Sequence, residues 1–223
     1  MKKLLSITLL GALLSLNLYA SEYIVLIDYS KSISQQDQNI YKKTLGSVLG
    51  KIEPEDRISL VNIGQSDMTK FSFFDEFTAE KGSTNKVKIH NKKGLQALWK
   101  RFLAKPFETE NETRIISSIR GAQQRFDASK SDDKILVILS DMIDSTKESK
   151  GQQFSKNVNC ASVPKVLQNI DKPSLKGIKV YVAGAGGKGD AGYQCLETFW
   201  KKFFVDSGVK ESDVIYQRIN PFN

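Results

Sequence analysis

Residues 24–32 read Ile-Val-Leu-Ile-Asp-Tyr-Ser-Lys-Ser, an apolar run that ends in one carboxylate followed by two hydroxyls. The apolar part is typical of a buried strand. In an α/β sheet, binding sites are built where the carboxyl ends of such strands meet the loops. We therefore expect Asp28, Ser30 and Ser32 to form a site rich in oxygen atoms. Such atoms suit a hard divalent cation that keeps some of its waters.

The rest of the chain alternates between strand and helix patterns. That alternation predicts an α/β fold with a doubly wound, mainly parallel central sheet flanked by helices. Aromatic residues 70–77 are expected to form an edge strand, and the polar stretches 80–93 and 145–159 are expected to form loops. The predicted strands cover residues 23–28, 57–63, 134–139, 177–183 and 214–217, and the predicted helices cover residues 34–49, 94–104, 113–126, 163–170 and 195–205.

The amino terminus has the pattern of a cleaved export signal. Lys2 and Lys3 precede an apolar stretch, and Leu18-Tyr19-Ala20 resembles a cleavage site. This predicts a signal peptide over residues 1–20 and one domain over residues 21–223, exported to a periplasm or secreted. No later stretch is long and apolar enough to span a bilayer, so no membrane span is expected after removal of the signal.

Charge and rare residues narrow the classes of function. The formal net charge is +8, and loss of Lys2 and Lys3 would leave +6, a value that solubility alone explains. The basic segment 86–93 lacks the interleaved aromatic residues that stack on bases, so no specific nucleic-acid binding is predicted. His90 is the only histidine, which excludes a histidine-rich metal centre.

Cys160 and Cys195 are the only cysteines, 35 positions apart. Disulfides persist in exported proteins. We therefore expect these two residues to form a structural disulfide.

The first motif resembles the Asp-x-Ser-x-Ser sequence of the metal-ion-dependent adhesion site (MIDAS) in von Willebrand factor A domains. The resemblance extends to Thr113, just before a predicted helix, and to Asp141, just after the buried strand 135–139. It implies that Ser30 and Ser32 hold the cation directly, and that Thr113 binds it directly or moves in with its loop when ligand arrives. It also implies that Asp28 and Asp141 act through water and hydrogen bonds. The implied cation is Mg²⁺, or alternatively Mn²⁺ or Ca²⁺, and a carboxylate of a partner protein would complete its coordination.

Two features depart from the family pattern. Met142 follows Asp141 where many relatives have glycine, which predicts a narrower site or an altered loop. The loop before Thr113, residues 108–112, is unusually acidic and could alter the choice of cation. Asp144 is expected to cap a turn with Ser145 and Thr146.

These observations predict a non-enzymatic, exported binding module that recognises a protein partner through a divalent cation. The first alternative is a metal-independent assembly or scaffolding component of the cell envelope. The second is a metal-dependent, phosphatase-like hydrolase, but that chemistry would need a second aspartate where Ser30 stands. Residues 184–189 match a Gly-x-Gly-x-x-Gly pattern, which we discount as a dinucleotide site because residues 190–193 are expected to continue the loop.

Overall fold

The computed structural model describes residues 20–63, 73–107, 113–144, 160–185 and 190–222. They form a six-stranded sheet with the order β3-β2-β1-β4-β5-β6. All neighbouring strands are parallel except β2 and β3, so the sheet has one antiparallel edge. The strands are β1 (Ser21–Ile27), β2 (Arg57–Asn62), β3 (Phe73–Thr78), β4 (Asp133–Leu139), β5 (Ile178–Ala183) and β6 (Val214–Tyr216).

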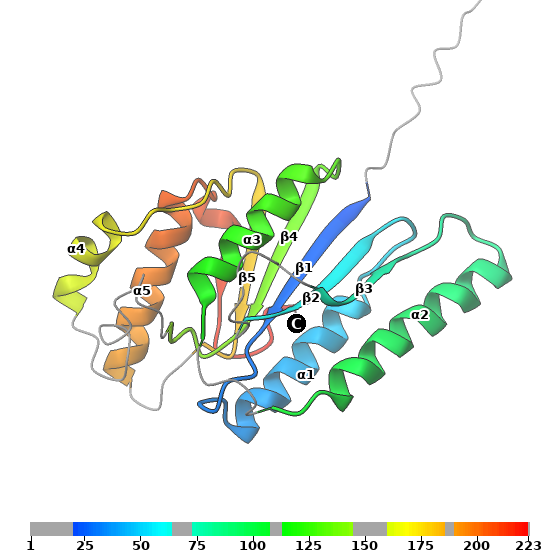
Figure 1. Cartoon of the computed structure of the whole chain (residues 1–223), viewed down its shortest axis with the longest axis horizontal. Coiled ribbons are helices and arrows are strands. Elements are labelled where there is room, and N and C mark those ends of the chain that lie inside the picture. The colour runs from blue at the N-terminus through cyan, green and yellow to red at the C-terminus, as the bar shows by residue number, and fades with distance from the viewer. Residues whose placement is uncertain (1–19, 64–72, 108–112, 145–159, 186–189, 223) are drawn as a thin grey trace, which may run out of the picture.

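Helices cover both faces of this sheet (Figure 1). One layer contains α1 (Gln35–Leu49) and α2 (Asn85–Ala104). The opposite layer contains α3 (Ile115–Ala128), α4 (Val163–Gln168) and α5 (Asp190–Asp206). The predicted α/β fold with a doubly wound, mainly parallel sheet is therefore confirmed.

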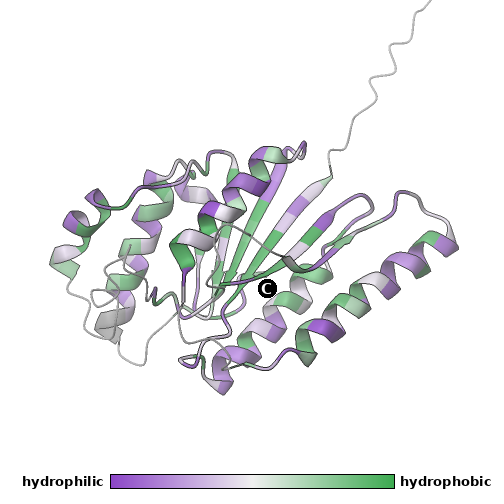
Figure 2. Cartoon of the chain, in the orientation of Figure 1, coloured by the Kyte–Doolittle hydropathy of each residue, from purple (hydrophilic) through white to green (hydrophobic). Residues whose placement is uncertain are grey.

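Side chains of the central strand β1 alternate between two hydrophobic cores, and Figure 2 shows the apolar strands between the two helix layers. Val25 and Ile27 pack with α1 and α2, whereas Ile24 and Leu26 pack with α3 and α5. This follows from the period of two along a strand. A strand covered on both faces reads as the continuous apolar run seen in the sequence.

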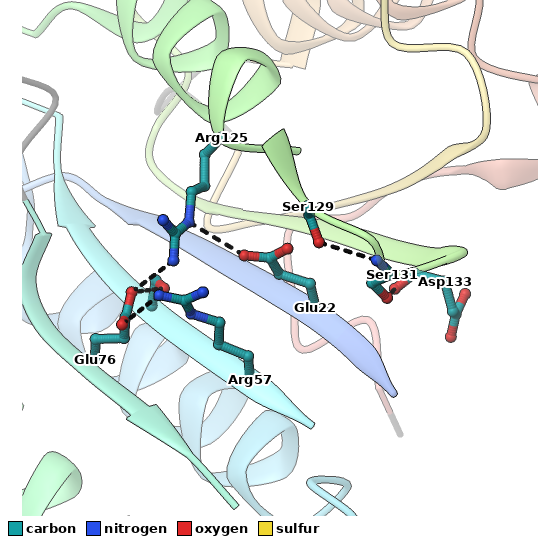
Figure 3. Close-up of polar contacts among 8 residues, drawn as sticks. Glu22, Arg57, Glu76, Arg125, Ser129, Ser131 and Asp133 are labelled. Carbon is teal, nitrogen blue, oxygen red and sulfur yellow. Dashed lines mark hydrogen bonds and ion pairs between the residues drawn. The ribbon is translucent and has the colours of Figure 1, made fainter. Parts of the chain in front are cut away.

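A polar cluster crosses the sheet near the starts of the parallel strands (Figure 3). Arg125 of α3 contacts Glu22 of β1 at 3.3 Å and Glu76 of β3 at 3.1 Å. Arg57 of β2 also pairs with Glu76, at 2.5 Å. Since Glu22 is only 2% exposed, its charge depends on Arg125 for compensation.

Most predicted elements form within a few residues of their expected bounds, but the prediction for residues 80–93 is wrong. Residues 80–93 were expected to be a loop, whereas α2 begins at Asn85. Thr84 caps this helix by accepting a hydrogen bond from the Val87 amide. No residue of its first three turns is fully buried, so the amphipathic pattern that marks a helix is weak there.

Cys160 and Cys195 form a disulfide with their Cα atoms 4.9 Å apart, as expected. The bond ties the segment before α4 to α5. No helix among the described residues is long and apolar enough to cross a membrane. The predicted signal peptide, except for Ala20, and the loop predicted over residues 145–159 lie outside the described residues.

Candidate cation site

The candidate site lies where β1 and β4 end side by side. Ile27 and Leu139 are paired in the parallel register of these strands. The Asp28 amide extends the pairing by donating to the Leu139 carbonyl at 2.9 Å. The loops that start at Asp28 and at Ser140 therefore leave the sheet together.

Asp28 is fully buried and is held by two donors. Its Oδ1 accepts a hydrogen bond from the Ser30 amide at 2.9 Å, and its Oδ2 accepts one from the Ser140 hydroxyl at 2.8 Å. The carboxylate therefore fixes the turn that carries the two serines of the motif. It also joins this turn to the loop after β4.

A chain of hydrogen bonds connects the motif to the third loop. The hydroxyls of Ser30 and Ser32 lie 3.0 Å apart, and Ser32 Oγ donates to Asp141 Oδ2 at 2.9 Å. The other oxygen of Asp141 accepts from the Ile143 amide at 3.0 Å. Four of the five predicted cation-site residues, Asp28, Ser30, Ser32 and Asp141, thus lie in one connected group.

The N-terminus of α1, the helix that follows the motif, is stabilised by a side-chain cap. Ser34 caps α1 in a reciprocal capping box with Asp37. The Ile33 amide donates to the Ser30 carbonyl at 3.3 Å. These bonds fix the path of the chain between the two serines and the helix.

Met142 departs from the expected arrangement in a specific way. Its φ is +63°, a left-handed conformation that favours glycine. Its side chain is fully buried in the core shared with α3 and α5. Its carbonyl accepts a hydrogen bond from Trp200 Nε1 at 2.8 Å. The loop therefore keeps the backbone geometry of a glycine while its side chain enters the core.

Thr113 is the fifth predicted residue. It is 4% exposed and lies two positions before α3. The start of α3 is tied to the third loop, because the Ile116 amide donates to Asp144 Oδ2 at 3.0 Å. Thr113 is therefore placed on a segment that is anchored beside the loop of Asp141.

Sequence reasoning missed two residues that organise the site. Ser140 joins Asp28 to the third loop, and its Oγ also accepts from the Met142 amide at 2.9 Å. Asp144 accepts a bond from the first turn of α3, whereas the turn that it was expected to cap includes Ser145 and Thr146, which lie outside the described residues. The polar Ser140-Asp141 pair directly after an apolar strand was the available signal for the first. For the second, the sequence holds no local signal, since Ile116 is 28 positions away.

The electrostatics of the site favour a cation. Burial raises the pKa of Asp28, and burial together with the charge of Asp28 raises the pKa of Asp141 to about 7. Neither carboxylate makes an ion pair with a basic side chain in the described part of the chain. Buried charges in proteins are normally paired or coordinate a metal.

The donor set also limits which cation fits. Within the described ranges, no three His, Cys, Asp or Glu side chains gather as a metal site. A cation here would have to take hydroxyl oxygens and water together with at most a few carboxylate oxygens. That set fits a hard divalent ion such as Mg²⁺.

Residues 190–193 were expected to continue the loop after the glycines, but that prediction is wrong, because α5 begins at Asp190. Gly184 nevertheless has a packing role. Its φ is +84°, and a Cβ at this position would lie 2.4 Å from the ring of Tyr41. The pattern also follows β5, whereas the dinucleotide fingerprint follows the first strand of its fold.

No family model matches the chain. No curated protein matches it in sequence either. Among solved structures, proximal thread matrix protein 1 from the mussel byssus aligns at 15% identity and a TM-score of 0.47, over 90% of this chain and 44% of that one. The same mussel protein with a zinc-occupied MIDAS motif aligns at 15% identity and a TM-score of 0.45, with the same coverage of both chains. The manganese-loaded TRAP protein of Plasmodium vivax aligns at 9% identity and a TM-score of 0.44, over 83% of this chain and 62% of that one. The chain thus spans less than half the length of the mussel protein.

Proposed function

We propose that this chain is an exported, non-enzymatic binding module that recognises a protein partner through a divalent cation. Ser30, Ser32 and Thr113 would hold the cation, and Asp28 and Asp141 would orient these residues and balance its charge. The bond from Ser32 Oγ to Asp141 Oδ2 carries the proposal, because it joins two loops at the end of the sheet. Hydroxyl and carboxylate oxygens that lie this close together can bind a hard divalent cation.

The chemistry of these residues explains why a partner would be recognised. Neutral hydroxyls donate little charge to a cation, so a Mg²⁺ held largely by them remains electrophilic and readily accepts a further anionic oxygen. Ser32 is exposed, whereas Asp28 and Asp141 are buried. A carboxylate of a partner can therefore approach from the side of the serines, and the buried carboxylates stay behind them.

The hydrolase alternative has weaker support. The residue two positions after Asp28 is Ser30, whose hydroxyl lies 3.0 Å from the Ser32 hydroxyl. A carboxylic acid at that position would be needed to protonate a leaving group in the phosphatase-like scheme. We therefore propose binding and not turnover for this site.

The test is a calorimetric titration of residues 21–223 with Mg²⁺ and Mn²⁺. We expect saturable binding at one site for the wild type and its loss in Ser30→Ala/Ser32→Ala. Ser83→Ala/Ser174→Ala is the matched control, because it removes two exposed hydroxyls elsewhere. Binding that survives in the first variant would contradict the proposed ligands. A wild type that binds neither cation would favour the metal-independent scaffold.

A further inference from the structure

The outer face of α2 is a second feature that the proposed function does not use. The helix contains six lysine and arginine residues and no aspartate or glutamate. It packs on the edge strand β3, two strands away from β1 and its loop. This surface is therefore separate from the candidate cation site.

The exposed residues of α2 include a regular stripe. Residues spaced alternately three and four apart share one face of a helix. Six such residues of α2 are all exposed, and we call them the α2 seam: Lys86, Ile89, Lys93, Gln96, Lys100 and Leu103.

The seam repeats every seven residues. Lysine recurs at 86, 93 and 100, and the positions three residues after these lysines carry Ile89, Gln96 and Leu103. Ile89 is 55% exposed and Leu103 is 46% exposed, two of the four large hydrophobic side chains exposed in the described part of the chain. At 1.5 Å per residue, the seam extends over about 26 Å.

The three lysines of the seam, Lys86, Lys93 and Lys100, make no ion pair among the described residues. Two described acidic side chains contact other residues of α2 instead, since Glu80 contacts His90 at 3.4 Å and Asp75 pairs with Arg101. Within the described ranges, no acidic side chain therefore pairs with the lysines of the seam.

The opposite face of α2 is held firmly, so the seam is presented on a fixed support. Leu98 and Phe102 are fully buried beside the sheet. Asn91 exchanges two hydrogen bonds with the backbone of Glu80, at 2.9 and 3.0 Å. At Gly94 a Cβ would lie 2.0 Å from the Phe77 ring, so the helix approaches β3 closely there.

We propose that the α2 seam binds an acidic amphipathic helix of a partner protein. Glutamate or aspartate at a seven-residue spacing in the partner would face the three lysines, and apolar side chains would cover Ile89 and Leu103. The heptad spacing matches how two helices pack along a shared seam. The complementary charge sets the choice of partner.

Other occupants fit the seam less well. A second copy of α2 would bring lysine against lysine. A membrane surface calls for a broad apolar face, whereas this face has only Ile89 and Leu103, 14 positions apart. A phosphate backbone would use the lysines but gains nothing from two aliphatic side chains at the same repeat.

The test uses a synthetic helical peptide of about three heptads with glutamate and leucine at the matching positions. Its binding to residues 21–223 is measured by fluorescence anisotropy, with a peptide of scrambled order and equal composition as the reference. We expect the ordered peptide to bind at least about tenfold more tightly than the scrambled one. Since the α2 seam holds no cation, EDTA should leave this binding unchanged, which separates its failure from failure of the cation site.

Three variants sharpen the result. Lys86→Glu/Lys93→Glu/Lys100→Glu should abolish binding, and Ile89→Asn/Leu103→Asn should weaken it at least about fivefold. The matched control, Lys43→Glu/Lys176→Glu/Lys210→Glu, makes the same change in net charge at exposed sites elsewhere and should bind as the wild type does.

Four results would each overturn the proposal. They are failure of the ordered peptide to bind, equal binding of the scrambled peptide, an equal loss in the control triple, and an unchanged affinity in the Ile89/Leu103 variant. Duplex DNA or phosphatidylglycerol vesicles that bind more tightly than the peptide, with the same dependence on the lysines, would assign the seam to that other class of partner.

Discussion

Ser32 Oγ donates a hydrogen bond to Asp141 Oδ2 at 2.9 Å, joining positions 109 residues apart in the sequence. This contact connects the loop after β1 to the loop after β4. The two loops meet because β1 and β4 are parallel neighbours whose last residues are paired. The register of the sheet therefore determines where the candidate site forms.

Replacing Ser140 with alanine should both destabilise the protein and weaken cation binding. The change leaves buried Asp28 Oδ2 and the Met142 amide without their partner. We expect a loss of about 2–4 kcal/mol in the free energy of unfolding and about a tenfold or greater loss of Mg²⁺ affinity. Urea unfolding and calorimetry measure the two effects, with Ser174→Ala as an exposed control. An unchanged Mg²⁺ affinity in a folded Ser140→Ala protein would contradict the role of Asp28.

Asp141 should make the cation-free protein less stable as the pH rises from about 4 to about 7. Burial and the charge of Asp28 raise the pKa of Asp141 from 3.8 to about 7. In that window the folded state keeps a proton that the unfolded state has released. Stability therefore falls by up to about 1.4 kcal/mol per pH unit for this one group.

The pH effect is measured as the difference between the wild type and Asp141→Asn in urea unfolding at several pH values. Added Mg²⁺ should reduce the decline, because the cation stabilises the ionised carboxylate. An identical pH dependence in both proteins would show that Asp141 titrates normally.

Replacing Arg125 with methionine should destabilise the fold at the end of the sheet opposite the site. It leaves Glu22, which is 2% exposed, without the guanidinium 3.3 Å away. Since Arg125 is partly exposed, we expect a cost of about 2–3 kcal/mol, below the range for a fully buried pair. The double change Glu22→Gln/Arg125→Met should recover part of that cost. A double variant no more stable than Arg125→Met alone would show that Arg125 does not compensate the charge of Glu22.

At Met142, substitution by glycine should destabilise the protein less than substitution by alanine, the reverse of the usual order at a buried position. Its φ of +63° strains any residue with a Cβ, at about 1–2 kcal/mol. Both substitutions lose the buried thioether side chain, but only glycine relieves the strain. We expect Met142→Gly to be about 1 kcal/mol more stable than Met142→Ala in urea unfolding. If alanine proves the more stable substitution, the left-handed conformation at this position is wrong.

The order of strands and helices was predictable because each buried strand is a continuous apolar run and most helices have one apolar face. The first half of α2 was not. Its inward side carries Val87, Asn91 and Gly94, which give no apolar stripe. Its outward side carries lysines, which favour a helix as well as a loop.

The residues of the candidate site likewise include some that the sequence could predict and some that it could not. Asp28, Ser30, Ser32 and Asp141 could be predicted because each follows the end of a recognisable strand. Asp144 could not, because its partner is the amide of Ile116 on a different element. The conformation of Met142 could not be predicted from the sequence either. Its side chain packs in the core, and its carbonyl accepts a hydrogen bond from Trp200.

The most direct measurement is a crystal structure of residues 21–223 grown with Mn²⁺, with the metal located by its anomalous scattering. We expect one strong peak within direct coordination distance of Ser30 Oγ and Ser32 Oγ, with Asp28 and Asp141 beside it. A protein crystallised with Mn²⁺ that shows no peak there, or shows its peak at other residues, would contradict the proposed cation site.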